Sequence, residues 1–173
     1  MKNLFIQKEK GHCTVFAFAN MFRKDLSHFM TEEFKGCDDE KERQIVASIE
    51  NDLGIAEVIS IRHSYNIPIP NELLFQILTF KEPVTEAQVE FDLIPYLLAV
   101  RRLPTHEFWH SVVVFNKNGE LFYSDPYTED IIKVDKETLF NQFIDCWSVK
   151  RLVINSAQDF ARLSSKAIGL ELV

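Results

Sequence analysis

The chain has 173 residues, 46% of them hydrophobic, which is typical of one globular domain with a substantial core. Its formal net charge of −7 argues against a surface for nucleic acids or anionic membranes. No apolar run approaches the ~20 residues of a membrane span, and the first residues do not resemble a signal peptide. We therefore expect one cytoplasmic domain over residues 1–173, with no membrane or nucleic-acid partner.

The cysteines predict neither a disulfide framework nor a metal site. Cys13, Cys37 and Cys146 are odd in number and far apart in the sequence. A disulfide-rich scaffold or a Cys-x-x-Cys zinc motif would need paired, closely spaced cysteines. The sequence therefore predicts no metal and no cofactor.

The N-terminal half is expected to be mainly helical. Residues 13–30 are apolar on nearly all sides, which predicts a central, buried helix. An apolar stripe predicts a second helix over about 39–52. Residues 55–65 fit either a helix or a strand, and residues 71–80 fit a helix weakly. Residues 85–93 fit a short capped helix.

The C-terminal half reads as strands with two further helices. Short runs rich in β-branched and aromatic residues predict strands over 96–101, 108–115, 120–124, 131–134 and 150–155. Asp135 is a candidate cap for a helix that carries Leu139, Phe140, Phe143 and Ile144, and another helix is expected to begin near Ser156. Helices followed by an antiparallel sheet define an α+β fold.

A hairpin signal predicts the partner of His110. Residues 116–119, Asn-Lys-Asn-Gly, are typical of a tight turn between two strands. If residues 117 and 118 form the loop, His110 faces Asp125 directly, about 5 Å away; if residues 118 and 119 form it, the two are diagonal neighbours about 7–8 Å apart. Only a three-residue loop would place Asp125 on the opposite face.

Cys13 lies where the first helix is expected to begin, two residues after Gly11. A thiolate is stabilised at a helix N-terminus, and a nearby imidazolium lowers the pKa of a thiol further. A thiol, an imidazole and a carboxylate are the parts of a nucleophile, its base and the acid that orients the base. The amide of Gln7 could then donate to an oxyanion together with the backbone N–H of Cys13. Taken singly, Cys13 also fits a small buried hydrophobe and His110 a core histidine.

These residues together resemble the papain-like cysteine peptidases, most closely the small bacterial branch that includes the double-glycine leader (bacteriocin-processing) peptidases. The resemblance rests on Gln7, Gly11, Cys13, His110 followed by Ser-Val-Val-Val, Asp125-Pro126, and a late aromatic helix with Phe140, Phe143 and Trp147. It implies a papain-like fold in which a central buried helix packs on the sheet. Thr14 departs from the Gly or Trp that follows the cysteine in many relatives.

The resemblance implies a function for each of the four site residues. Cys13 would be the nucleophile, His110 the base, Asp125 the residue that orients His110, and Gln7 the oxyanion donor. The expected activity is hydrolysis of peptide or isopeptide bonds in a protein or peptide substrate. Acyl transfer or deamidation by the same triad, and an inactive peptide-binding module, remain as alternatives, and substrate identity and oligomeric state stay open.

Overall fold

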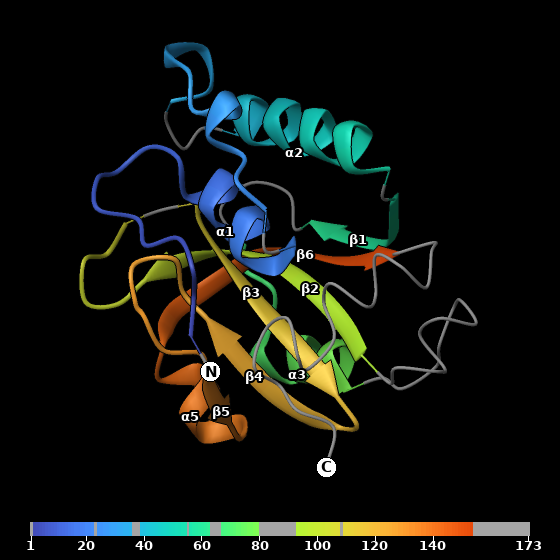
Figure 1. Ribbon diagram of the computed structural model, residues 1–173. Helices are drawn as coiled ribbons and strands as arrows, with labels where there is room; N and C mark the ends of the chain where they lie inside the picture. Colours follow the sequence, from blue (N-terminus) through green and yellow to red (C-terminus); the bar gives the residue numbers. More distant parts are fainter. Residues whose placement is uncertain are drawn as a thin grey trace.

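The computed structural model describes residues 2–22, 24–35, 39–54, 56–62, 67–79, 93–107 and 109–153. Within them one antiparallel sheet has helices on both of its faces (Figure 1). The helices are α1 (Cys13–Phe22), the 3-10 helices η1 (Ser27–Phe29) and η2 (Glu32–Phe34), α2 (Asp39–Leu53), α3 (Asn71–Thr79) and α5 (Lys136–Phe140). The strands are β1 (Ala56–Arg62), β2 (Leu93–Arg102), β3 (His110–Lys117), β4 (Glu120–Ser124), β5 (Ile132–Val134) and β6 (Phe143–Val153).

The six strands lie in the order β1-β6-β2-β3-β4-β5, and every neighbouring pair is antiparallel. Five of them come from the C-terminal half, as the α+β prediction requires. The sixth, β1, comes from the segment that fitted either a helix or a strand, and it extends the sheet beside β6. The α+β class predicted from the sequence is therefore confirmed.

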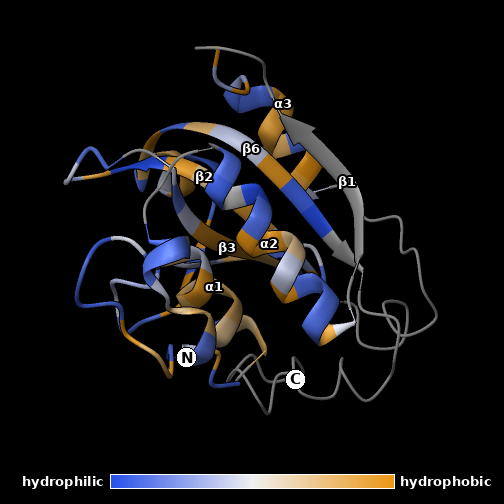
Figure 2. Ribbon diagram, turned by 90° about the horizontal axis from the view of Figure 1, so that it is seen from above, coloured by the Kyte–Doolittle hydropathy of each residue, from blue (hydrophilic) through white to orange (hydrophobic). Residues whose placement is uncertain are grey.

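The helices α1 and α2 cover one face of the sheet. α1 contacts β3, and its apolar side chains form a core with Val113 and Phe115 of that strand. Nine of the ten residues of α1 are buried, which confirms the prediction of a central, buried helix. In Figure 2, α1 is mostly coloured as hydrophobic, whereas α2 alternates between hydrophilic and hydrophobic turns, as an outer helix should.

The opposite face of the sheet packs on α3 and α5. Val112 and Val114 point to this side and join a second core with Leu74 of α3 and Leu139 of α5. Because both faces are covered, all eight residues of β3 are buried. This explains why β3 reads in the sequence as a nearly continuous apolar run and not as an alternating one.

The first helix is shorter than the predicted 13–30. It ends at Phe22, and the amide of Lys24 then donates to the carbonyl of Ala19. Asp25 starts a new turn because its carboxylate accepts a hydrogen bond from the amide of Ser27 at 2.8 Å. A short acidic side chain that binds the backbone two residues further on competes with helix formation. The rest of the apolar run therefore contains the separate 3-10 helix η1 and does not extend α1.

The predicted late helix is also shorter, and the aromatic residues at its end belong to a strand. Asp135 caps α5 as expected, since its side chain accepts from the amide of Thr138 at 2.8 Å. α5 ends at Phe140, and Phe143 begins β6, paired with Arg102 of β2. The apolar spacing was compatible with a helix, but pairing with β2 decides the structure of 143–153. Ile144 and Trp147 therefore lie on β6 as well.

Three expectations fall partly or wholly outside the described residues. The predicted helices at 85–93 and from Ser156 lie there, except that Leu93 is the first residue of β2 and not the end of a helix. The strand expected over 150–155 is described as far as Val153. No helix among the described residues is long and apolar enough to cross a bilayer.

Candidate functional site

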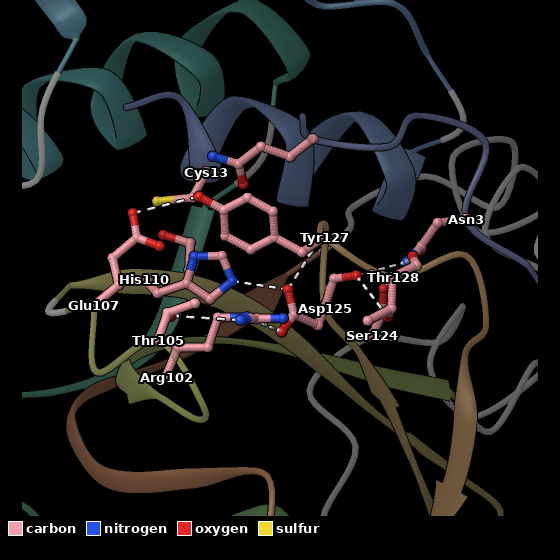
Figure 3. Close-up of polar contacts among 12 residues, drawn as sticks. Asn3, Cys13, Arg102, Thr105, Glu107, His110, Ser124, Asp125, Tyr127 and Thr128 are labelled. Carbon is pink, nitrogen blue, oxygen red and sulfur yellow. Dashed lines mark hydrogen bonds and ion pairs between the residues drawn. The ribbon is translucent and has the colours of Figure 1, made fainter. Parts of the chain in front are cut away.

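The hairpin between β3 and β4 settles the relation of His110 to Asp125. Lys117 pairs with Glu120, so residues 118 and 119 form the two-residue loop. Asp125, one residue beyond the last β4 pair, is therefore a diagonal neighbour of His110 on the same face, the second of the two predicted registers. The imidazole Nε2 and the carboxylate Oδ1 lie 2.8 Å apart (Figure 3).

This contact determines which ring nitrogen of His110 is available for chemistry. A carboxylate accepts the Nε2–H, so the neutral ring carries its lone pair on Nδ1. Nδ1 is buried and has no partner at full hydrogen-bond geometry among the described residues. In Figure 3 the free nitrogen lies on the side of the ring that faces Cys13, and Asp125 lies on the other side.

Cys13 is the first residue of α1, so its sulfur lies at the positive end of the helix dipole. The turn before it needs a glycine, because Gly11 has φ +116°, where a side chain is strained. The carbonyl of His12 accepts the first helical hydrogen bond, from Phe16. The thiol therefore follows a tight turn, and the positive φ of this turn explains why a glycine stands two residues before Cys13.

The thiol contacts the loop that precedes β3. Its Sγ donates to the carbonyl of Trp109 at 3.6 Å, across 96 residues of sequence. Trp109 has φ +58°, a left-handed conformation that costs a non-glycine residue of order 1 kcal/mol. Its ring packs on Trp147, with centroids 6.1 Å apart. The ring that stacks on His110 belongs to Tyr127.

Electrostatics favour a charged imidazole. Burial is the largest single influence on His110 and acts to lower its pKa, but the hydrogen bond with Asp125 and the neighbouring Cys13 outweigh it and raise the pKa of His110 to about 9. Burial also acts to raise the pKa of Asp125, yet hydrogen bonds with His110, the amide of Tyr127 and Arg102 bring that pKa below its ordinary value. The pair is therefore set to carry opposite charges at neutral pH.

Asp125 is held by more than His110. Its Oδ2 accepts from Nε of Arg102 at 2.7 Å, and its Oδ1 accepts from the amide of Tyr127 at 2.9 Å. Asn3 donates to the carbonyl of Asp125 at 3.0 Å. Because every direction of rotation would break one of these contacts, the carboxylate keeps a fixed position beside the imidazole.

Tyr127 covers the imidazole. The rings of Tyr127 and His110 stack with centroids 4.9 Å apart, and the guanidinium of Arg102 lies 4.7 Å from the centre of the Tyr127 ring. The hydroxyl of Tyr127 contacts Glu107 at 3.4 Å. An aromatic cover of this kind excludes water from the His–Asp contact and strengthens it.

The two residues that follow Cys13 and His110 bind each other. The hydroxyls of Thr14 and Ser111 lie 2.7 Å apart and are both buried. This contact joins the first turn of α1 to the second residue of β3, next to the residues that carry the thiol and the imidazole. Thr14 thus has a structural role in this chain.

Gln7 lies in the segment before Cys13. Its backbone N–H donates to the carbonyl of Pro126 at 2.8 Å, which anchors the segment to the loop after β4. The side chain is buried; Nε2 donates to the carbonyl of Glu9 at 2.9 Å, and Oε1 has no partner among the described residues. One of its two N–H donors is therefore used locally.

The four predicted site residues thus occur in one region, but other members of the region have no signal in the sequence. Arg102, Glu107 and Tyr127 contact Asp125, His110 or one another, yet each is an ordinary polar residue of a strand end or loop. The clue that could have found Arg102 is the strand pairing, which brings the ends of β2 and β3 together. Among the described residues, no three His, Cys, Asp or Glu side chains are grouped closely enough to hold a metal ion.

Comparison of the chain with protein-family models and with curated proteins finds no match.

Proposed function

We propose that this chain is a cysteine peptidase that works through Cys13, His110 and Asp125, with a papain-like arrangement of a nucleophile helix on an antiparallel sheet. The observation that carries the proposal is the orientation of His110. Its Nε2 is bound to Asp125 at 2.8 Å, which turns Nδ1 towards a thiol at the start of a helix. A buried histidine with a purely structural role would not need a free, unpartnered Nδ1 on that side.

In the proposed resting state the proton of Cys13 is already on Nδ1 of His110, as the raised pKa of His110 favours, and the Cys13 thiolate attacks the carbonyl carbon of the substrate. The imidazolium then gives this proton to the leaving amine as the C–N bond breaks. Water attacks the resulting thioester, with His110 as the base, and the acid product leaves. Asp125 keeps the ring in the required tautomer and balances its positive charge throughout.

The oxyanion is assigned to two donors. The backbone N–H of Cys13 belongs to the first turn of α1, where amides have no partner within the helix. The remaining N–H of Gln7 is the second candidate. The loss of one such donor typically costs roughly 10²–10³ in kcat.

The first test is selective alkylation. Iodoacetamide at about pH 5.5 is expected to modify Cys13 well ahead of Cys37 and Cys146, mapped by mass spectrometry. An ordinary thiol, with a pKa of about 8.5, is almost fully protonated at this pH. Cys146 is buried, and burial raises the pKa of its thiol further. Equal labelling of all three cysteines would contradict the proposal.

The second step of this test separates hydrolysis from the other chemistries of the same triad. Cys13→Ala should abolish turnover of a peptide library while circular dichroism and the melting temperature stay close to those of the parent. Mass spectrometry of the products distinguishes a cleaved backbone from an added or deamidated side chain. A peptide aldehyde that forms no adduct with Cys13 would favour an inactive binding module.

A further inference from the structure

Glu107 and Cys13 are both neighbours of the Tyr127 hydroxyl. Glu107 lies in the loop between β2 and β3, two residues before the Trp109 carbonyl that accepts the Cys13 thiol. Figure 3 shows its carboxylate, the Tyr127 hydroxyl and the Cys13 sulfur grouped on the same side of the His110 ring. The hydroxyl of Tyr127 is influenced by both neighbours, since burial, then Glu107, then Cys13 raise its pKa.

The described residues do not supply the Glu107 carboxylate with strong hydrogen-bond donors. Oε1 of Glu107 contacts the neutral Tyr127 hydroxyl at 3.4 Å, which is long for a hydrogen bond to a carboxylate, and Oε2 is buried with no partner among the described residues. The nearby cation, Arg102, is held by Asp125 at 2.7 Å and by Thr105. A buried carboxylate oxygen without a partner is unfavourable and marks a place for a donor.

We propose that Glu107 is a specificity-determining residue that binds a positively charged ammonium or guanidinium group of the substrate next to the reacting carbonyl. The inference rests on the proposed function, because it assigns the substrate class of the same site. Two unpartnered buried oxygens in this region, Oε1 of Gln7 and Oε2 of Glu107, are acceptors. A region rich in acceptors suits a group that carries several N–H donors.

A cation is favoured over a neutral donor for a second reason. A negative charge at Glu107 opposes formation of the thiolate at Cys13. A bound substrate cation neutralises Glu107 and removes that opposition, so binding of the correct substrate also promotes the reactive form of the nucleophile. The weak Tyr127 contact, at 3.4 Å, is exchanged for a charge-assisted one.

The charge preference is tested with methanethiosulfonate reagents, which modify thiols without requiring any enzymatic turnover. We compare the rates at Cys13 of a cationic trimethylammonium-ethyl reagent and an anionic sulfonato-ethyl reagent. Glu107→Gln should lower the cation-to-anion rate ratio at least tenfold, because a full charge close to the sulfur is removed. Glu120→Gln, a change at an exposed glutamate paired with Lys133 on β4, should leave the ratio unchanged.

The peptide arm uses acyloxymethyl ketone probes that differ only in the residue before the reactive group: Lys, norleucine or Glu. The Lys probe should label Cys13 fastest, and Glu107→Lys should reverse the order in favour of Glu. A second arm offers cadaverine or a neutral alcohol to the acylated protein. Preferential transfer of the acyl group to cadaverine would show that Glu107 binds a cation on the acceptor molecule and not on the acyl donor.

The outcomes separate the two proposals. An unchanged reagent ratio in Glu107→Gln, with Cys13 still selectively alkylated, overturns the role of Glu107 and leaves the peptidase proposal standing. A changed ratio with no labelling by any peptide probe supports the charge at Glu107 and counts against the peptidase. Equal labelling by the Lys and norleucine probes together with equal capture of both acceptors overturns the substrate class.

Discussion

At the residue scale, His110 is unusual because it is fully buried and still favours its charged form. A buried imidazole normally stays neutral, since burial penalises charge. Here Asp125 supplies the opposite charge at 2.8 Å, and Tyr127 covers the pair. Two polar residues that would each be costly alone are thus stable together, and removal of either leaves the other buried without its partner.

The raised pKa of His110 predicts how stability depends on pH. Its pKa is about 9 in the folded chain and about 6.5 in an unfolded one, so its contribution to stability is complete below about pH 6.5 and is lost as the pH rises through 9. The difference in free energy of unfolding between the parent and His110→Gln should therefore be largest near pH 6 and shrink by pH 10. Urea unfolding at a series of pH values measures it.

A difference that stays constant over that range would show that the imidazole is neutral in the folded chain. The lowered pKa of Asp125 has the opposite sign: its contribution is present above about pH 4 and is lost as the pH falls. As the pH falls from 7 to below about 4, the free energy of unfolding should therefore decrease more in the parent than in Asp125→Asn.

At the element scale, the site depends on how α1 is seated on β3. The Thr14–Ser111 contact joins the ends of the two elements that carry the thiol and the imidazole. Below it, Val15 of α1 and Val113 of β3 belong to the same core. A small shift between the helix and the strand would move the sulfur away from the ring without disturbing either element internally.

A double-mutant cycle tests this link. Thr14→Val keeps the shape of the side chain and leaves the buried Ser111 hydroxyl without a partner, so it should destabilise the chain by about 1–3 kcal/mol. Thr14→Val with Ser111→Ala should cost less than the sum of the single changes, because both hydroxyls are gone. The selectivity of Cys13 alkylation should fall in the single variants; strict additivity of the free energies would exclude the contact.

The sequence predicted the elements that local patterns determine. The hairpin at Asn118, the cap at Asp135 and the buried helix from Cys13 all depend on neighbouring residues, and each is confirmed. Residues 143–147 were assigned to a helix because their apolar spacing allowed it, and only pairing with β2 makes them a strand. Non-local pairing has no signal in a short window of sequence.

The same distinction applies to the site. Cys13, His110 and Asp125 could be predicted because a helix start and a tight hairpin restrict where they lie. Arg102 and Glu107 could not, since they flank a four-residue segment whose path is set by contacts such as the hydrogen bond from the Arg102 amide to the Glu107 carbonyl at 2.9 Å. Residues contributed by such loops are found only once the strands on either side are placed.

At the scale of the whole molecule, the first residues of the chain hold the loop that carries Asp125. The side chain of Asn3 donates to the carbonyls of Asp125 and Thr128 and accepts from Ser124, at 2.7–3.0 Å. A backbone bridge between Lys2 and Asp130 continues the contact. The N-terminal segment thus connects the start of the chain to the far side of the site.

Asn3→Ala should therefore affect both stability and reactivity. It removes three hydrogen bonds, two of them buried and one partly buried, which we expect to cost about 2–4 kcal/mol in free energy of unfolding. Because the 125–128 loop loses its support, the preferential alkylation of Cys13 should also weaken. Asn141→Ala, at an exposed position that follows α5, is a matched control that should change neither quantity. Normal Cys13 reactivity in a destabilised Asn3→Ala would limit the segment to a structural role.

Cys13 and Trp109 are 96 residues apart in the sequence, so the ribosome synthesises them at well-separated times. The proposed nucleophile therefore leaves the ribosome long before His110 and Asp125, so a nascent chain carries an ordinary thiol. The sheet itself is completed only when the last strand has emerged, because β6 lies between β1 and β2. If the proposed function holds, chains that end before His110 would have no reactive pair.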